Sequence, residues 1–218
     1  MELHQIETYL DSSNPQDRMK AITELRNYEP PLVVPLLKRR MHDQEFMIRS
    51  FVAMGLGFKQ TDEGFELLVN IIENDKDYNV RAEAANSLAK YGEQSISHLV
   101  RLFQKDSHWL VRQSIFAAIE LANYPEILLD LSILGMRGDD LVVKLTAIAN
   151  LAELAKTAYA AFALEILLEA ADSKGAEVRA QVARILKHFA DPRVEEALNK
   201  LRQDGDHRVV GATLESLV

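Results

Sequence analysis

The stretch NVRAEAANSL, residues 79–88, establishes the fold class because its pattern recurs along the chain. Val80 precedes Arg81, and Ala84 and Leu88 follow at helical spacing, so the three apolar side chains share one helix face. Full or weaker copies of the pattern lie around seven positions: Arg18, Arg49, Arg81, Arg112, Lys144, Arg179 and Val210. The steps between these positions are 31, 32, 31, 32, 35 and 31 residues, a period typical of stacked repeat units.

A second amphipathic run precedes each copy, so each repeat is predicted to be a helix pair, A then B, with the copy in helix B. The predicted fold class is all-α, a right-handed α-solenoid of about seven such pairs. Because one pair cannot bury its apolar face alone, the pairs are expected to stack as a single domain over residues 1–218. The repeats are predicted at residues 1–28, 29–60, 61–92, 93–123, 124–155, 156–190 and 191–218. The 35-residue step predicts a small insertion, near residues 172–175 or within 154–160.

Composition argues against several classes of function. The net charge of −8 predicts that nucleic acid is not a partner, and the basic run at residues 38–40 is expected to complement the dipole at a helix C-terminus. The absence of cysteine excludes disulfides and thiolate nucleophiles or metal ligands. No apolar run is long enough to span a membrane and no leader pattern precedes the repeats, so a cytoplasmic protein is expected.

No catalytic or metal site is predicted. The histidines show no metal-binding spacing, and they are His4, His42, His98, His108, His188 and His207. Gly55 and Gly57 form only a bare GxG inside a helix-B copy, where close helix packing is the better explanation.

The turn between helices A and B repeats a polar residue six positions before the Arg position. These residues are Ser12, Asp43, Asp75, Asp106, Gly138, Ser173 and Asp204. Side-chain oxygens there are expected to cap the free N–H groups at the start of helix B. A functional acidic stripe is the alternative.

One column of the aligned repeats is broken by a large apolar residue. Two positions after the Arg the column reads Lys20, Phe51, Glu83, Ser114, Thr146, Gln181 and Ala212. Phe51 does not fit a solvated ridge, and Met54 and Phe58 continue the same helix face. The pattern predicts an apolar stripe on the inner, ligand-facing surface of helix B in repeat two, unless a neighbouring helix covers it.

A second column, three positions before the Arg, places aromatic residues in three consecutive repeats. It reads Pro15, Phe46, Tyr78, Trp109, Leu141, Ala176 and His207. A hydrophobic staple at each helix start is one explanation. The other is that Phe46, Tyr78 and Trp109 contact a protein partner or stack on a planar tetrapyrrole.

The Val-Arg-x-x-Ala pattern with its short period resembles the HEAT repeat, and within that group the phycobilisome-lyase-type HEAT-like repeats. Residues 42–57 and 108–112 look most like a cyanobacterial HEAT-repeat protein that is a partner of an IscA-type iron–sulfur carrier. The resemblance implies no intrinsic cofactor, and an iron–sulfur cluster or a bilin shared through the partner. Because the chain has no cysteine, ligands of such a cluster would come mainly from the carrier.

These patterns predict a non-catalytic scaffold or adaptor that binds a protein partner, an IscA-type carrier by resemblance, on the inner helix-B surface of repeats two to four. The residues predicted to bind it are Phe46, Phe51, Met54, Phe58, Tyr78, His108 and Trp109. The alternative is a bilin lyase or bilin-detaching factor acting on phycobiliproteins. A plain array that dimerises through the apolar residues of 214–218 is a third hypothesis.

Overall fold

The computed structural model describes residues 1–120 and 123–215, and over these residues it is all-helical, with no β-strand. The predicted α-solenoid of seven helix pairs is confirmed in this part of the chain. The chain forms two compact units, Met1–Ile119 and Glu120–Val218. The extent of the single domain stays a prediction.

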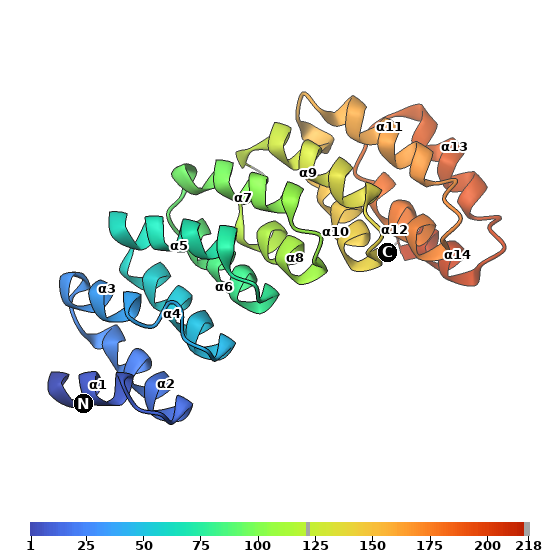
Figure 1. Cartoon of the computed structure of the whole chain (residues 1–218). Coiled ribbons are helices and arrows are strands. Elements are labelled where there is room, and N and C mark those ends of the chain that lie inside the picture. The colour runs from blue at the N-terminus through green and yellow to red at the C-terminus, as the bar shows by residue number, and fades with distance from the viewer. Residues whose placement is uncertain (121–122, 216–218) are drawn as a thin grey trace. The chain divides into compact units, whose positions relative to one another are not determined.

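The N-terminal unit contains four helix pairs in two layers (Figure 1). The first layer holds the A helices, which are α1 (Leu3–Leu10), α3 (Pro30–Lys38), α5 (Asp62–Asn74) and α7 (Glu93–Lys105). The second layer holds the B helices, which are α2 (Pro15–Glu24), α4 (Phe46–Lys59), α6 (Tyr78–Ala89) and α8 (Trp109–Ala118). A 3₁₀ turn, η1 (Leu25–Asn27), continues α2.

The second unit contains three helix pairs. Its A helices are α9 (Pro125–Arg137), α11 (Ala160–Ala170) and α13 (Pro192–Leu201), and its B helices are α10 (Leu141–Asn150), α12 (Ala176–Leu186) and α14 (His207–Leu214). A 3₁₀ segment, η3 (Leu151–Lys156), follows α10, so the insertion lies at the second of the two predicted places. The last apolar residue of the seventh copy, Leu217, is outside the described residues.

The core follows from the repeated apolar triplet. Val80, Ala84 and Leu88 are fully buried, as are the equivalent residues of the preceding repeat. Proline is the first residue of α2, α3, α9 and α13, where its missing N–H leaves no intrahelical hydrogen bond unmade.

The turn residues cap the start of helix B as predicted, through the backbone N–H of the residue two positions later. The side chains that accept this N–H are those of Ser12, Asp43, Asp75, Asp106, Ser173 and Asp204. In five repeats the side chain at that later position caps a further N–H group of helix B: Asn14, Asp77, His108, Asp140 and Asp206. Four of the turn carboxylates also accept ion pairs from the arginine of the preceding repeat, which the sequence analysis did not predict. These pairs are Arg18–Asp43 at 2.8 Å, Arg49–Asp75 at 2.7 Å, Arg81–Asp106 at 2.6 Å and Arg179–Asp204 at 2.7 Å. We call this set the arginine ladder.

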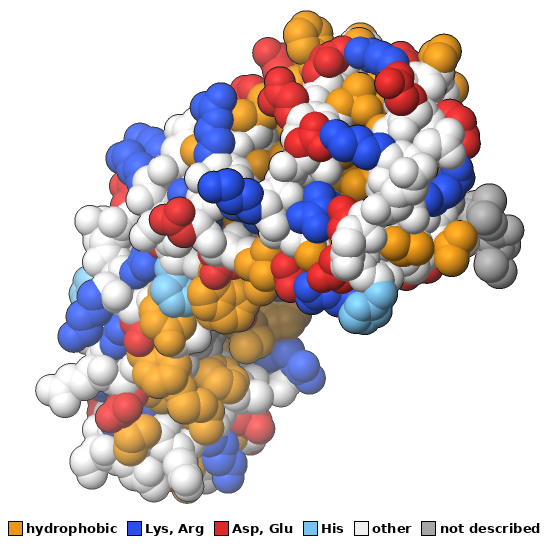
Figure 2. Space-filling model, turned by 90° about the vertical axis from the view of Figure 1, so that its right-hand side faces the viewer, with side chains coloured by type: hydrophobic (Ala, Val, Ile, Leu, Met, Phe, Trp, Pro, Cys, Tyr) orange, Lys and Arg blue, Asp and Glu red, His pale blue; other side chains and the backbone are white. Residues whose placement is uncertain are grey.

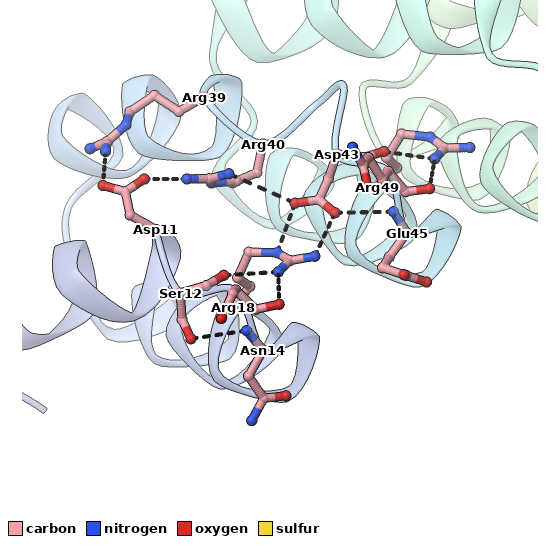
Figure 3. Close-up of polar contacts among 11 residues, drawn as sticks. Asp11, Ser12, Asn14, Arg18, Arg39, Arg40, Asp43, Glu45 and Arg49 are labelled. Atoms are coloured by element: carbon pink, nitrogen blue, oxygen red, sulfur yellow. Dashed lines mark hydrogen bonds and ion pairs between the residues drawn. The ribbon is translucent and has the colours of Figure 1, made fainter.

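The arginine ladder also holds each turn (Figure 3). Arg18 donates to the carbonyl oxygens of Ser12 and Ser13 in its own turn, while its guanidinium contacts Asp43 of the next repeat. Asp43 in turn accepts the backbone N–H of Glu45 at 3.1 Å. A buried arginine therefore links two consecutive turns, and the basic charge is satisfied by both. Gly138 and Ser173 stand in the carboxylate column of repeats five and six, so the described part of the second unit has one such rung, Arg179–Asp204.

The basic run ends α3 as predicted, and its charges are paired. Lys38 contacts Glu63 at 2.8 Å, and Arg39 and Arg40 both contact Asp11. The run therefore presents no free basic patch for a phosphate backbone.

Candidate partner-binding surface

An apolar stripe follows α4 along its whole length. Phe51 and Met54 are half-buried, and Phe58 is 54% exposed. Met47, which the column analysis missed, adds a 49% exposed side chain one turn before Phe51. Figure 2 shows a broad group of hydrophobic side chains on the side of the N-terminal unit that faces the viewer. Neighbouring helices thus cover the stripe only in part.

A cavity of about 140 Å³ lies beside this stripe, between the end of α2, η1, α3 and α4. Its walls come from the following residues: Ile22, Thr23, Leu25, Arg26, Val33, Leu37, Phe51, Met54, Gly55, Phe58 and Lys59. The chain leaves the α-helix for a 3₁₀ turn at Leu25, and Gly55 contributes no side chain on the opposite wall. The sequence pattern indicated the stripe, but this cavity depends on how four elements pack.

Cations surround the exposed end of the stripe. Lys59 donates to the carbonyl oxygens of Arg26 and Tyr28, which holds its ammonium group at the cavity. Lys90, which follows the last residue of α6, lies 4.5 Å above the ring of Phe58, a cation–π distance. Burial raises the pKa of Glu83, two turns before Lys90 in the chain, while the charge of Lys90 acts in the opposite direction.

The aromatic column occupies the first residue of three successive B helices. Phe46, Tyr78 and Trp109 are 41%, 41% and 44% exposed. The ring of His108 stacks on that of Tyr78 at 3.7 Å and lies 6.0 Å from that of Trp109. The His108 ring is oriented by the N–H of Leu110, which donates to its Nδ1 at 3.2 Å and so caps α8. We call Tyr78, His108 and Trp109 the aromatic cluster.

The structure places six of the seven predicted residues in two groups. Phe51, Met54 and Phe58 line the cavity, whereas Tyr78, His108 and Trp109 form the aromatic cluster at the N-terminal ends of the B helices. Phe46 is the first residue of α4 and Phe58 is next to its last, so α4 runs from one region to the other.

Residues 1–120 and 123–215 contain no group of three or more His, Cys, Asp or Glu side chains placed to hold a metal ion. Over the same residues, no helix combines the length and the apolar character needed to cross a bilayer.

Comparisons with known proteins agree with this repeat architecture. Residues 41–120 match the family model for HEAT repeats. None of the curated proteins compared with the sequence matches it. The chain is similar to the solved complex of CpcE and CpcF of phycocyanin lyase from Nostoc sp. PCC7120, with 17% identity, a TM-score of 0.55 and coverage of 100% of this chain and 87% of that chain.

Two further solved structures show the same likeness. An engineered protein matches with 18% identity and a TM-score of 0.52, over 100% of this chain and 68% of that chain. The Escherichia coli YIBA protein matches with 18% identity and a TM-score of 0.50, over 100% of this chain and 92% of that chain. At such identities these likenesses show the fold alone.

Proposed function

We propose that this chain, a HEAT-like repeat protein, is a non-catalytic scaffold that binds a protein partner through the helix-B layer of repeats two to four. The observation that carries the proposal is the exposure of large apolar and aromatic side chains on this one layer, among them Phe58, Tyr78 and Trp109. Exposed apolar surface of this kind is typical of interaction sites, and Trp and Tyr are frequent anchors at interfaces. The charged side chains around Phe58 supply the polar rim that such interfaces have.

Single polar substitutions at this surface are expected to weaken binding of the partner. Trp109→Gln and Phe51→Gln should each reduce affinity by about tenfold, because each removes an apolar anchor worth at least 1.4 kcal/mol. The partner is captured from the native host with the unaltered chain, and its Kd is then measured for each variant. Phe162→Gln is the matched control, since Phe162 is a 65% exposed aromatic residue in the other unit. Unchanged affinity in both test variants, at unchanged helical content, would contradict the proposed surface.

We further propose an IscA-type iron–sulfur carrier as the partner, on the resemblance of residues 42–57 and 108–112. The chain has no cysteine, so thiolate ligands of a shared cluster would belong to the carrier. The role of this chain would then be to bind the carrier. Its residues would form the contact surface for the carrier and would not supply thiolate ligands to the cluster.

The aromatic cluster favours a second candidate, a bilin lyase or a bilin-detaching factor. A planar tetrapyrrole can stack on exposed rings, and Tyr78 and His108 already stack with an interplanar angle of 10°. In this case, mixing the protein with phycocyanobilin and apo-phycocyanin should shift the bilin absorption band. Trp109→Gln should reduce the rate of that shift. No spectral change beyond that of the bilin and apoprotein alone would exclude this candidate.

A further inference from the structure

The size of the cavity beside α4 limits what it can hold. Its volume of about 140 Å³ is close to that of an engineered apolar cavity of about 150 Å³ that binds benzene. Pockets for drug-sized ligands have about 300–1,000 Å³. The cavity therefore fits one Leu or Phe side chain, and it is too small for a tetrapyrrole.

The walls of the cavity suit an apolar group. Ile22, Leu25, Val33 and Leu37 are at most 4% exposed, so they form a fixed floor that belongs to the core of the unit. Met54 lies on the accessible side, and its flexible thioether side chain can adapt to an inserted group.

The rim of the cavity has the opposite charge to the chain as a whole. Arg26, Lys59 and Lys90 lie at or beside Phe58, and among the described residues no carboxylate forms an ion pair with any of the three. Glu24, which precedes Arg26 by two residues, binds the N-terminal ammonium group at 3.2 Å instead. Lys90 also acts on the charge of Glu83, but no ion pair joins the two among the described residues. Since the net charge of the chain is −8, this group of three cations without an ion-pair partner marks a local preference for an acidic ligand.

We infer that the cavity beside α4 is a socket for one Leu or Phe side chain of a protein partner, presented by a segment that carries carboxylates on both sides of this anchor. The anchor fills the apolar space between Leu25 and Met54, and the flanking carboxylates contact Arg26, Lys59 and Lys90. This inference rests on the proposed scaffold function and names the chemistry of the segment that binds.

Synthetic peptides test the socket directly. The probe is a fluorescein-labelled helical peptide with one Phe at the centre of a Glu-rich face, and it is compared with the same peptide carrying Ala for Phe or Lys for Glu. Each change is expected to weaken binding at least tenfold, since one removes the buried ring and the other reverses the charge complementarity. Binding of the Phe peptide should also shift the NMR resonance of the Met54 methyl group.

A plugging variant separates the socket from the rest of the surface. Thr23→Phe places a ring at the cavity wall and should lower the affinity for the Phe peptide at least tenfold. Thr8→Phe is the matched control, because Thr8 is an exposed α1 residue whose hydroxyl donates to the carbonyl four residues earlier, as that of Thr23 does. Lys90→Glu should lower the affinity for the Glu-rich peptide and raise the affinity for the Lys-rich peptide.

Several results would overturn the inference. These are equal affinity of the Ala and Phe peptides, unaltered binding to Thr23→Phe, binding of 3-phenylpropionate as tight as that of the peptide, and a homodimer that Thr23→Phe dissociates. If the peptide tests contradict the socket while Trp109→Gln still weakens binding of the native partner, the scaffold function stands without the socket. If the peptides behave as expected but no partner is captured, the socket stands and the proposed surface of repeats two to four fails.

Discussion

Arg49→Ala is expected to lower the free energy of unfolding of the N-terminal unit by about 3–5 kcal/mol. Arg49 is 5% exposed, and its Nε and Nη2 atoms contact the two oxygens of Asp75 at 2.7 and 3.0 Å. Its Nη1 atom also donates to the carbonyl oxygens of Asp43 and Gln44. Removing the guanidinium leaves the Asp75 carboxylate buried without its cation, and this uncompensated charge is the main cost.

Chemical denaturation followed by circular dichroism measures the effect, and Lys38→Ala is the control. The Lys38–Glu63 pair has a similar separation of 2.8 Å, but its side chains are 55% and 48% exposed. Water screens an exposed pair, so its loss should cost under about 1 kcal/mol. Equal stability losses in the two variants would show that burial does not set the value of the ladder pairs.

The arginine ladder shows what periodicity can and cannot reveal. Helix pairs were predictable because apolar spacing along one helix is a local property of the sequence. The hydrogen bonds from the turn carboxylates to nearby N–H groups were predictable because they are local. The partner of Arg49 lies 26 residues away in the next repeat, so the ion pairs of the ladder were not predicted. The two columns did contain a signal, because the steps from arginine to the next turn carboxylate are 25 or 26 residues at every rung.

The candidate surface was also predictable only in part. Phe51 was identified because it breaks a polar column, which requires only a correct alignment of the repeats. The cavity beside Phe51 was not predicted, because its volume depends on the 3₁₀ turn at Leu25 and on the packing of α3 against α4. The cations at its rim come from the C-terminal end of α6 and from η1 as well as α4, and no single repeat column contains Arg26, Lys59 and Lys90.

Gly57→Ala is expected to destabilise the N-terminal unit by about 2 kcal/mol, against the usual preference of helices for alanine. A Cβ atom on Gly57 would lie 2.6 Å from the Ser87 Cβ and 2.9 Å from the Ser87 Cα. The Cα belongs to the backbone of α6 and cannot rotate away, so α4 and α6 must move apart. Close packing, which the sequence suggested for this glycine, is therefore a contact between two helix backbones.

Gly211→Ala in α14 separates this contact from helix propensity. A Cβ atom there would have no neighbour within 4 Å among residues 123–215, so alanine should stabilise the second unit by up to about 1 kcal/mol. The two substitutions are chemically identical and should have opposite signs in chemical denaturation. Adding Ser87→Gly to Gly57→Ala removes the side chain that meets the new methyl group and should recover part of the loss. A Gly57→Ala chain as stable as the unaltered protein would mean that α4 and α6 can separate without cost, and the close approach at Ser87 would then contribute nothing to the stack.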